Sequence, residues 1–442
     1  MNKTVLLLST FCSVFMTTPC AHAGTFTTLT YNIAGLLEPF SSAPSPRRQA
    51  TEQISCYVNA FDIVNVQEDF NYHAALYDTC NRHPPQNRTP TTGGMGFGSG
   101  LNTMSYFSFE PAKRVTWKNC SGVDCLTPKG FTLTTVRLEQ GTYLDVYNLH
   151  AQAQNQDKDA ANRRANIQQL LDYINEHSSQ NAILIMGDTN TRYERRSDNM
   201  ERFIEAGFKD VWVELYRNGA LPPKVSESND NPTAKPLLSC HPVTTSAQCE
   251  IVDKVLYRDN RYLTLTPLYY VLREDDINQQ GQKLSDHPPV AVHWLYTTNP
   301  MIQISDPIGG GGGNSFNHVN SITNGNNITR IAIRTGARVD QVELTMSDNT
   351  VYVHGAEGGN PSELILHEDE YLTDLAACVG TKNGSNRIFY ISFTTNHDRT
   401  LFGGNITDYC EHWSAPSGWQ IQGLHGRSGQ ELDQVGVIYS PL

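Results

Sequence analysis

The sequence predicts an α/β domain followed by an all-β domain, and three features of the chain lead to this prediction. From Thr25 to about Thr298, short apolar runs alternate with polar helical segments, a pattern typical of a sheet covered by helices. The glycine-rich segment "IGGGGGNSF" begins at Ile308 and marks a change of character. Beyond it, short strand-like runs separated by Gly and Asn continue to Leu442 without a convincing helix.

The first residues of the chain have the features of an export signal. Lys3 precedes the apolar run "VLLLSTFCSVFM", which is too short to span a bilayer, and Ala21 and Ala23 fit a cleavage site after Ala23. The alternative is a first buried strand or helix, but charge, core length and small residues together favour a signal peptide over residues 1–23. We therefore expect a secreted, extracellular protein. No later apolar run is long enough for a membrane helix.

The cysteines indicate disulfides. Two of the ten, Cys12 and Cys20, leave with the predicted signal, and the other eight fall into pairs of near neighbours. An even count in an exported chain favours disulfides over a metal site, because no CxxC or Cys/His ligand spacing is present. Sequence alone does not fix connectivity, so pairing by proximity is an expectation. The expected pairs are Cys56 with Cys80, Cys120 with Cys125, Cys240 with Cys249, and Cys378 with Cys410.

The first domain contains six strand-like runs and one clear helix. The runs lie in "TFTTLTYNIAGL", "FDIVNVQED", "TYLDVYNLHAQ", "NAILIMGDTN", "CEIVDKVLY" and "HPPVAVHWLY". Between the third and fourth, "ANRRANIQQLLDYINEH" carries one apolar stripe of an amphipathic helix, formed by Ile167, Leu170, Leu171 and Ile174. This order predicts an α/β domain over residues 24–298.

The second domain reads as strands throughout. The strand-like runs are "ITRIAIRTG", "VDQVELTMSD", "TVYVHG", "RIFYISFTTN", "WQIQGLHG" and "DQVGVIY". We expect a linker over residues 299–304 and an all-β domain over residues 305–442, which is roughly 140 residues and an ordinary domain size.

Polar side chains at the ends of the strand-like runs form a candidate site. In an α/β sheet, functional sites assemble at strand ends. Oxygen ligands from Asn, Glu and Asp suit Mg²⁺, and histidines beside them can move protons near neutral pH. Together these groups have the chemistry of phosphoester hydrolysis, in which a metal polarises phosphate and a base activates water. The positions are Asn32, Glu68, His150, Asp188, Asn190, Asp253, Asp286 and His287.

Each position alone also has a plain structural interpretation. "GDTN" is good turn chemistry, Glu68 could simply end a strand, and His150 could be a satisfied core histidine. Asp253 could be a charge at a strand edge, and the Asp286–His287 pair could belong to a loop before an edge strand. The catalytic interpretation is favoured because the whole set occurs together, in one order, at strand ends.

This series resembles the endonuclease/exonuclease/phosphatase superfamily of metal-dependent phosphoesterases over about residues 25–298, with "GDTN" and "SDHPPV" as its most specific parts. The resemblance implies a DNase I-like four-layer α/β sandwich of two facing sheets. It also implies that Asn32, Glu68 and Asp286 stand at the metal, with Glu68 as the principal ligand. The metal implied is Mg²⁺, with Mn²⁺ or Co²⁺ as alternatives.

The same resemblance assigns catalytic roles. Asp188 and Asn190 would position the nucleophile and hold phosphate. His287 would be the general base, with Asp253 as its orienting carboxylate. His150 would stabilise the transition state or protonate the leaving group, and the division of roles between the two histidines stays open.

Three segments narrow the substrate. "EDFNYHAAL", "CSGVDCLTPKGFTL" and "NLHAQAQ" are similar to the segments of secreted bacterial sphingomyelinases that read ExFD, CGxDxLxxKGF and THLQA. By this resemblance Asp124 and Lys129 lie beside the phosphate, where a Lys offers a point positive charge. The alternative is a disulfide-closed hairpin with Lys129 on the surface. The implied substrate is a phospholipid such as sphingomyelin, cleaved in the manner of a phospholipase C.

The chain departs from those enzymes just before "SDH", where they carry an aromatic-rich hairpin with exposed Trp. Here the stretch offers Tyr269, Tyr270 and Leu272 but no Trp, which puts direct bilayer insertion in doubt. The head group also stays open, because no cage of aromatic faces for choline can be named. A secreted nuclease or other phosphodiesterase is the alternative, but a net charge of −12 and scattered Lys and Arg argue against tight nucleic-acid binding.

The second domain resembles jacalin-like lectins over about residues 305–442, through "PIGGGGGNSF", "FYISFTTN" and "GLHGRSGQELDQVGVIY". The resemblance implies a β-prism of three four-stranded sheets. Sugar would be held by Asp433, backbone groups of Gln430 and Glu431, and the loop at Gly310. The expected partners are therefore a glycan and a host or target membrane surface, besides the phospholipid substrate. The alternative is a β-domain that stabilises or displays the enzyme without binding sugar.

Overall fold

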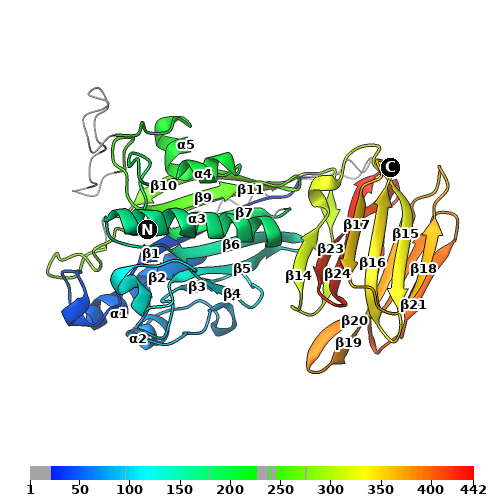
Figure 1. Ribbon diagram of the computed structural model, residues 1–442, viewed down its shortest axis with the longest axis horizontal. Coiled ribbons are helices and arrows are strands. Elements are labelled where there is room, and N and C mark those ends of the chain that lie inside the picture. The colour runs from blue at the N-terminus through cyan, green and yellow to red at the C-terminus, as the bar shows by residue number, and fades with distance from the viewer. Residues whose placement is uncertain are drawn as a thin grey trace, which may run out of the picture.

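The computed structural model describes residues 21–94, 96–178, 180–225, 237, 240, 245–273 and 276–442. The predicted signal peptide falls mostly on residues 1–20, outside this set, so its cleavage stays a prediction. Two domains lie end to end along the long axis of the molecule (Figure 1). Among the described residues, no helix has the length and apolar character needed to cross a bilayer.

The first sheet of the first domain has five strands. In spatial order they are β10 (Leu263–Leu272), β11 (Val290–Thr298), β1 (Ala23–Asn32), β2 (Ile63–Gln67) and β3 (Asn102–Ser105). Central strand β1 runs parallel to β2 and antiparallel to β11. The carboxyl ends of β1 and β2 therefore meet at the same edge of the sheet.

The second sheet has six strands. In spatial order they are β4 (Lys113–Thr116), β5 (Gly130–Glu139), β6 (Thr142–His150), β7 (Ala182–Asp188), β9 (Asp253–Arg258) and β8 (Lys209–Asp210). Strand β7 is buried along its whole length, which explains its continuous apolar sequence. β6 and β7 are parallel, so their carboxyl ends also share one edge.

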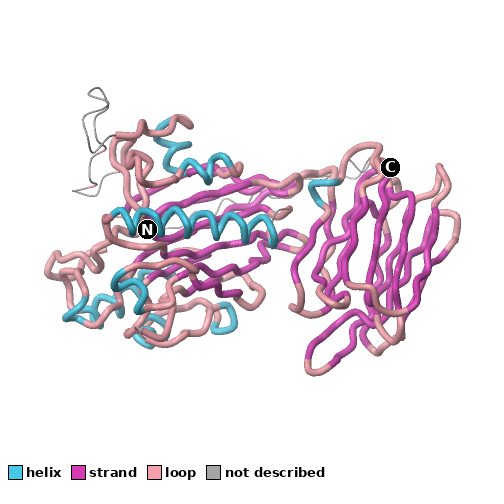
Figure 2. The backbone as a smooth tube through the Cα atoms, in the orientation of Figure 1, coloured by secondary structure: helices cyan, strands magenta, loops and turns pink. Residues whose placement is uncertain are grey.

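Among the described residues of the first domain, five helices complete the fold, together with short 3₁₀ turns (Figure 2). They are α1 (Arg47–Tyr57), α2 (His73–Asp78), α3 (Asp157–His177), α4 (Glu201–Glu205) and α5 (Val211–Arg217). The predicted apolar stripe of α3 is buried in the core, so the amphipathic interpretation is confirmed. A capping box between Gln156 and Asp159 begins this helix just after the end of β6.

The sheets pack face to face, and helices cover their outer faces (Figure 1). Ala50 and Ile54 of α1 share a core with Leu29 of β1, on the outer side of the first sheet. Polar bonds join the facing sides of the sheets: Asn65 donates to the Tyr147 carbonyl at 3.0 Å. The layers are thus helix, sheet, sheet and helix, which confirms the predicted four-layer sandwich.

The second domain consists of strands and loops apart from one 3₁₀ turn, Val319–Ser321 (Figure 2). A four-stranded sheet contains β17 (Val351–Gly355), β16 (Val339–Met346), β15 (Ile328–Thr335) and β18 (Asn360–Ile365). The other strands are β12 (Gln303–Ile304), β13 (Ile308–Gly309), β14 (Asn314–Asn317), β19 (Leu372–Lys382), β20 (Ser385–Thr395), β21 (Thr400–Gly404), β22 (Tyr409–Ser414), β23 (Trp419–Ser428) and β24 (Leu432–Pro441).

These nine strands form one continuous hydrogen-bonded sheet instead of the two separate sheets that the prism prediction implies. The physical reason is a single bridge, Leu372 to Ile421, which joins the β19 group to the β23 group. The three faces of the strands enclose one apolar core, so the β-prism architecture itself is confirmed.

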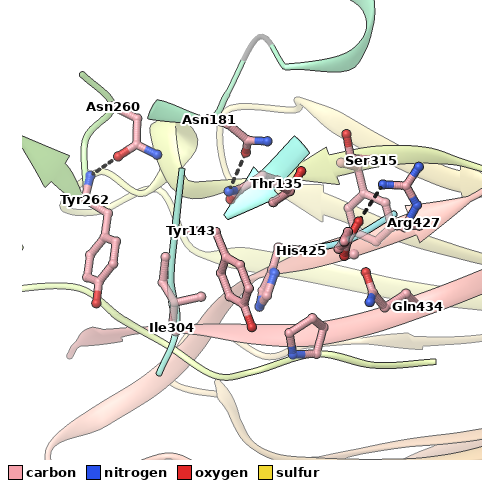
Figure 3. Close-up of a pocket in the computed structure, with 16 residues that line it drawn as sticks. Thr135, Tyr143, Asn181, Asn260, Tyr262, Ile304, Ser315, His425, Arg427 and Gln434 are labelled. Atoms are coloured by element: carbon pink, nitrogen blue, oxygen red, sulfur yellow. Dashed lines mark hydrogen bonds and ion pairs between the residues drawn. The ribbon is translucent and has the colours of Figure 1, made fainter. Parts of the chain in front are cut away.

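Contacts tie the two domains together at the predicted linker. Asp306 accepts hydrogen bonds from the Arg137 guanidinium at 2.6 Å and the Tyr143 hydroxyl at 2.6 Å. Figure 3 shows the junction, where a cavity of about 60 Å³ lies between Tyr143, His425 and their neighbours. Residue Ile302 is buried, and β12 pairs with β24. The segment predicted as a linker is therefore packed against both domains.

All four predicted disulfides are present. Cys56–Cys80, Cys120–Cys125, Cys240–Cys249 and Cys378–Cys410 have Cα atoms 4.0–5.3 Å apart. This agrees with the pairing by proximity expected from the sequence, and with an oxidising compartment.

Candidate active site

The predicted catalytic positions meet at the end of the sandwich that faces away from the second domain. Helix α3 shows the direction: it begins just after the end of β6, and its last residue, His177, accepts a bond from Ser315 of the second domain. The carboxyl ends of β1, β2, β6 and β7 lie at the other end of the domain from that contact. Side chains from both sheets converge there.

Asn32 joins the two sheets at this site. Its Nδ2 donates to Glu68 Oε1 and to Asp188 Oδ2, each at 3.2 Å. Its Oδ1 accepts from the Ala34 amide at 3.1 Å. The Asn32 carboxamide therefore holds one carboxylate from each sheet and turns its own oxygen away from them. Its role at a metal stays a prediction.

Glu68 leaves β2 in a strained backbone conformation. Its φ of 58° is in the left-handed region, which non-glycine residues seldom occupy. The chain approaches closely here, because the Gly35 amide donates to the Glu68 carbonyl at 3.0 Å. A Cβ at Gly35 would lie 2.3 Å from that oxygen, so only glycine fits. The strain aims a partly exposed carboxylate, 19% accessible, into the site.

Asp188 is the central carboxylate. It ends β7, is almost fully buried, and lies 3.3 Å from His150 Nε2 and 3.8 Å from His287 Nε2. The Asn190 amide donates to Asp188 Oδ1 at 2.9 Å, and Asn190 itself has a φ of 52°. Gly187 and Asp188 of the "GDTN" segment thus end strand β7, and the loop that follows holds the Asp188 side chain through the Asn190 amide.

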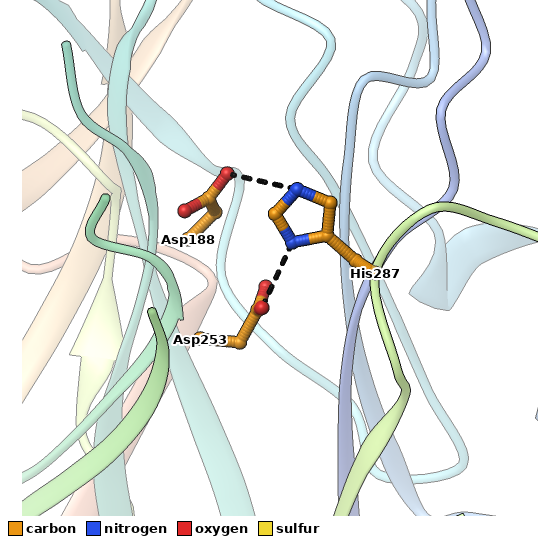
Figure 4. A group of neighbouring side chains, drawn as sticks. All are labelled: Asp188, Asp253 and His287. Atoms are coloured by element: carbon orange, nitrogen blue, oxygen red, sulfur yellow. Dashed lines mark hydrogen bonds and ion pairs between the residues drawn. The ribbon is translucent and has the colours of Figure 1, made fainter. Parts of the chain in front are cut away.

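His287 forms a dyad with Asp253. Its Nδ1 lies 2.8 Å from Asp253 Oδ2, and its Nε2 points towards Asp188 (Figure 4). Burial opposes a charge on the ring, but the Asp253 and Asp188 carboxylates outweigh it and raise the pKa of His287 well above its usual value. These carboxylates therefore favour the protonated form of His287, which is the form that a general base takes after it has accepted a proton.

His150 has the opposite electrostatic environment. Burial, together with the positive charges of Lys129 and His287, holds the pKa of His150 well below its usual value. Lys129 Nζ lies 3.0 Å from His150 Nε2, and the Trp117 indole donates to the His150 carbonyl at 2.7 Å. The surroundings thus favour the neutral form of His150 and the protonated form of His287.

Lys129 and Asp124 form a buried ion pair beside these histidines. Lys129 Nζ is 2.8 Å from Asp124 Oδ1, and Asp124 Oδ2 accepts from the Ala153 amide at 2.6 Å. Both side chains are about 10% exposed or less. The alternative of a surface lysine on a disulfide-closed hairpin is therefore wrong for Lys129, although the Cys120–Cys125 hairpin does exist.

Asp286 lies at the solvent-facing side of the site. Its side chain is exposed, and its charge helps to raise the pKa of Glu68, although burial is the larger cause. Burial and the Asp286 carboxylate thus both disfavour a charge on Glu68, which has the Asn32 amide beside it. Such an oxygen-rich place suits a hard cation. A second group, Asp188, Asp253 and His287, also has ligand atoms within 4.8 Å of one another.

Three further residues support the site and are not among the positions predicted from the sequence. Ser285 Oγ donates to the Asn32 carbonyl at 2.6 Å and accepts from the His287 amide at 3.2 Å. Arg47 donates to the Leu284 carbonyl at 2.6 Å, and Trp117 supports His150 as described above. Ser285 could have been found, because it precedes Asp286 in "SDHPPV", whereas nothing local points to Arg47.

The aromatic part of the stretch before "SDHPPV" belongs to strand β10. Tyr270 and Leu272 are buried in the core, whereas Leu268, Tyr269 and Val271 face solvent. A bulge between Pro267 and Tyr269 shifts the alternation of β10, which explains this split. Of the three residues that the sequence offers here, Tyr270 and Leu272 are therefore part of the core.

In the second domain, the predicted sugar-binding positions lie together. The Gly310 amide donates to the Asp433 carbonyl at 2.8 Å, and Gln430 is exposed beside them. Asp433 Oδ1 accepts from Arg387 at 3.0 Å. The Glu431 carboxylate is bound by Arg338, whose hydrogen bond is the main reason that its pKa falls to about 2. The Asp433 and Glu431 carboxylates are thus each paired with an arginine side chain.

The fold and the site define a phosphoesterase-type sandwich joined to a β-prism. The model of the Endonuclease/Exonuclease/phosphatase family 2 matches residues 40–293, more than half of the chain, and the chain belongs to this family. The jacalin-like lectin domain model matches residues 305–438.

Two relatives from mycobacteria, Mycobacterium bovis and Mycobacterium tuberculosis, are named sphingomyelinase. Each is 35% identical over 285 residues, which is 63% of this chain and 54% of the relative. The chain thus spans about half the length of the curated relatives it matches. A jacalin-related lectin of Arabidopsis thaliana is 29% identical over 119 residues, 26% of this chain and 25% of that protein.

Solved structures resemble each part. Staphylococcus aureus beta toxin is 16% identical with a TM-score of 0.43, covering 60% of this chain and 99% of its own. SmcL is 17% identical with a TM-score of 0.42, covering 62% of this chain and 99% of its own. A Malaysian banana lectin is 25% identical with a TM-score of 0.28, covering 32% of this chain and 99% of its own.

Proposed function

We propose that the protein is a secreted, Mg²⁺-dependent phosphodiesterase that hydrolyses a phospholipid such as sphingomyelin in the manner of a phospholipase C. One observation is the main support for this proposal. Two carboxylates, two histidines and a buried lysine lie together at one end of the sandwich: Glu68, Asp188, His150, His287 and Lys129. The relatives named sphingomyelinase support the lipid substrate. The four disulfides support export.

Glu68 and Asp286 would hold the cation, with Asn32 as the positioning residue. Their carboxylates repel each other, and Glu68 is partly exposed, so a divalent ion would relieve an unfavourable pair. Oxygen donors favour Mg²⁺, with Mn²⁺ or Co²⁺ as alternatives. When bound, such an ion polarises a phosphate oxygen. The Asp253–His287 contact uses the His287 Nδ1, which favours proton transfer over metal binding for that group.

The two histidines divide the proton work in this proposal. In its neutral form, with Nδ1 bound to Asp253, His287 would take the proton of the attacking water through Nε2, the atom directed to the centre of the site, and the carboxylates beside it would stabilise the imidazolium that forms. His150 and Lys129 face the same centre and would stabilise charge on the phosphate or the leaving oxygen. Asp188 and Asn190 would place the water and the phosphate.

The second domain would bind a glycan and raise the local concentration of the enzyme at a glycosylated membrane surface. The Asp433, Glu431, Gln430 and Gly310 group supports this proposal. Because the active site faces away from this domain, the sugar site would act as a tether instead of extending the substrate groove.

A substrate panel tests the function. Purified protein is offered sphingomyelin, a lysophospholipid, an inositol phosphosphingolipid, DNA and RNA, each with Mg²⁺ and with chelator. We expect Mg²⁺-dependent release of phosphocholine, loss of that release in His287→Ala, and retention in the surface variant Asp172→Asn. Cleavage of DNA or RNA without lipid turnover would favour the alternative, a secreted nuclease, and overturn the lipid assignment.

A further inference from the structure

Three large apolar side chains stand exposed on two loops beside the catalytic end. Phe97 is 84% exposed, Val123 65% and Leu126 68%. Gly96 and Leu126 line one cavity of about 350 Å³, whose other wall carries Asp124 and Lys129 of the proposed active site. We name Phe97, Val123 and Leu126 the rim patch. Exposed apolar groups this large at the mouth of a site indicate a contact surface.

The loop that carries Val123 and Leu126 is built to present them. The Cys120–Cys125 disulfide closes it, and Gly122 adopts a φ of 57° in its turn. Asp124, the only charged residue between Cys120 and Pro128, points inward to Lys129 and the Ala153 amide. The outward face of the loop is therefore uncharged and held in place.

The neighbouring loop is equally free of charge. From Thr89 to Phe109 the sequence contains no Asp, Glu, Lys, Arg or His. In a chain with a net charge of −12, such a stretch lowers the cost of desolvating this face. The loops touch, because a Cβ at Gly96 would lie 3.6 Å from the Leu126 carbonyl oxygen.

We propose that the rim patch inserts into a lipid bilayer and so places the catalytic mouth on the membrane. This inference rests on the proposed phospholipid substrate, whose phosphodiester lies at the bilayer surface. Leu126 of the patch and Gly96, the neighbour of Phe97, line the cavity that also contains Lys129, so insertion would bring the phosphate to that lysine. The second domain lies at the opposite end of the sandwich and cannot make this contact (Figure 1).

Vesicle binding by the full chain tests the proposal. Glycan-free vesicles of phosphatidylcholine and sphingomyelin are used in chelator, so that neither sugar nor turnover contributes. We expect Phe97→Ser with Leu126→Ser to weaken co-sedimentation by at least about tenfold. The matched control, Phe402→Ser with Ile406→Ser, removes apolar groups of similar exposure from the second domain and should bind as the parent does.

Two further measurements separate the possible failures. The rim variant and the parent should hydrolyse a soluble chromogenic phosphodiester at the same rate. If the parent itself does not hydrolyse this substrate, the result counts against the proposed function and not against the membrane contact. Phe97→Trp should show blue-shifted emission with vesicles, and Phe402→Trp should not. Unchanged vesicle binding of the rim variant overturns the proposal, as does loss of soluble turnover in that variant alone. A dimer that the rim substitutions dissociate, with vesicle binding unchanged, would instead assign the patch to a second copy.

Discussion

The Nδ1 atom of His287 lies 2.8 Å from a carboxylate oxygen of Asp253, and the two residues come from different sheets of the sandwich. Asp253 begins β9 in the second sheet, whereas His287 precedes β11 in the first. The dyad therefore exists only when the sheets have packed. It leaves the other ring nitrogen of His287 free to face Asp188.

Removing the carboxylate of this dyad should lower turnover with little effect on folding. Asp253→Asn keeps the shape but loses the charge that stabilises a protonated His287, so we expect kcat to fall by about 10²-fold or more. His287→Ala should cost at least as much, and the double variant no more than the worse single one, because the residues act as a unit. Steady-state kinetics on a soluble substrate measure this, with Asp172→Asn as a surface control. Additive losses would show that the two residues act separately.

Glu68→Gln should separate metal binding from stability. The substitution removes the proposed principal ligand, so Mg²⁺ affinity measured by calorimetry should fall at least about tenfold. Without metal, the melting temperature should not fall, because the variant relieves the repulsion between Glu68 and Asp286 and keeps the Asn32 hydrogen-bonding partner. An unchanged Mg²⁺ affinity would move the metal site to the Asp188, Asp253 and His287 group.

The sequence predicts that the site residues lie close together, because they stand at strand ends. It does not predict the contacts that these residues make with one another. The apolar pattern places Asn32, Glu68, His150 and Asp188 at strand ends, and parallel pairing brings those ends together. The left-handed backbone at Glu68 and the outward oxygen of Asn32 depend on how the sheets pack. Periodicity over a few residues contains no such information.

The same limit applies to the other parts of the chain. The burial of Tyr270 follows from a β-bulge, and a bulge leaves no clear mark in an apolar run. In the second domain, the pairing of Asp433 with Arg387 joins residues 46 positions apart. The disulfides were predictable because their partners are near in sequence, which restricts the possible pairings.

Asp433→Asn should uncouple glycan binding from catalysis. An amide accepts hydroxyl hydrogen bonds less strongly than a carboxylate, and it loses the Arg387 ion pair, so retention on immobilised glycans should fall at least about tenfold. Hydrolysis of a soluble substrate should be unchanged, because the active site lies at the far end of the other domain. Asp369→Asn, an exposed carboxylate of the same domain, is the control. Equal retention of both variants would mean that this domain does not bind sugar through Asp433.

Three histidines of the second domain, the buried His318 and His425 and the half-buried His354, should make stability fall in mild acid. Burial is the main cause that lowers the pKa of His354 and His425 to about 4, and it also holds the pKa of His318 well below its usual value. The unfolded chain takes up protons as pH falls through its own pKa of 6.5, but the folded protein does not until about pH 4. The free energy of unfolding should therefore drop between pH 6.5 and 4 and be flat above, by up to about 1.4 kcal/mol per pH unit for each histidine.

Denaturant titrations at fixed pH values measure this slope. His354→Gln removes one of the three groups and should reduce the slope by roughly one proton, whereas the exposed His412→Gln should leave it unchanged. His354 Nε2 lies 2.7 Å from His318 Nε2, so the variant also relieves a pair that cannot be doubly charged. Stability that is flat down to pH 4.5 would contradict the prediction.

The Lys129–Asp124 pair should have separable structural and catalytic effects. Lys129→Met leaves the buried Asp124 without its cation, which should cost about 3–5 kcal/mol of unfolding free energy and also remove the positive charge beside His150. Adding Asp124→Asn should restore much of the stability, because no unpaired charge then remains, but it should not restore turnover. Thermal unfolding and kcat on a soluble substrate are measured for all four proteins of the cycle. Recovery of turnover together with stability would show that Lys129 only supports the fold, and the phosphate contact would then have to be assigned to another cation.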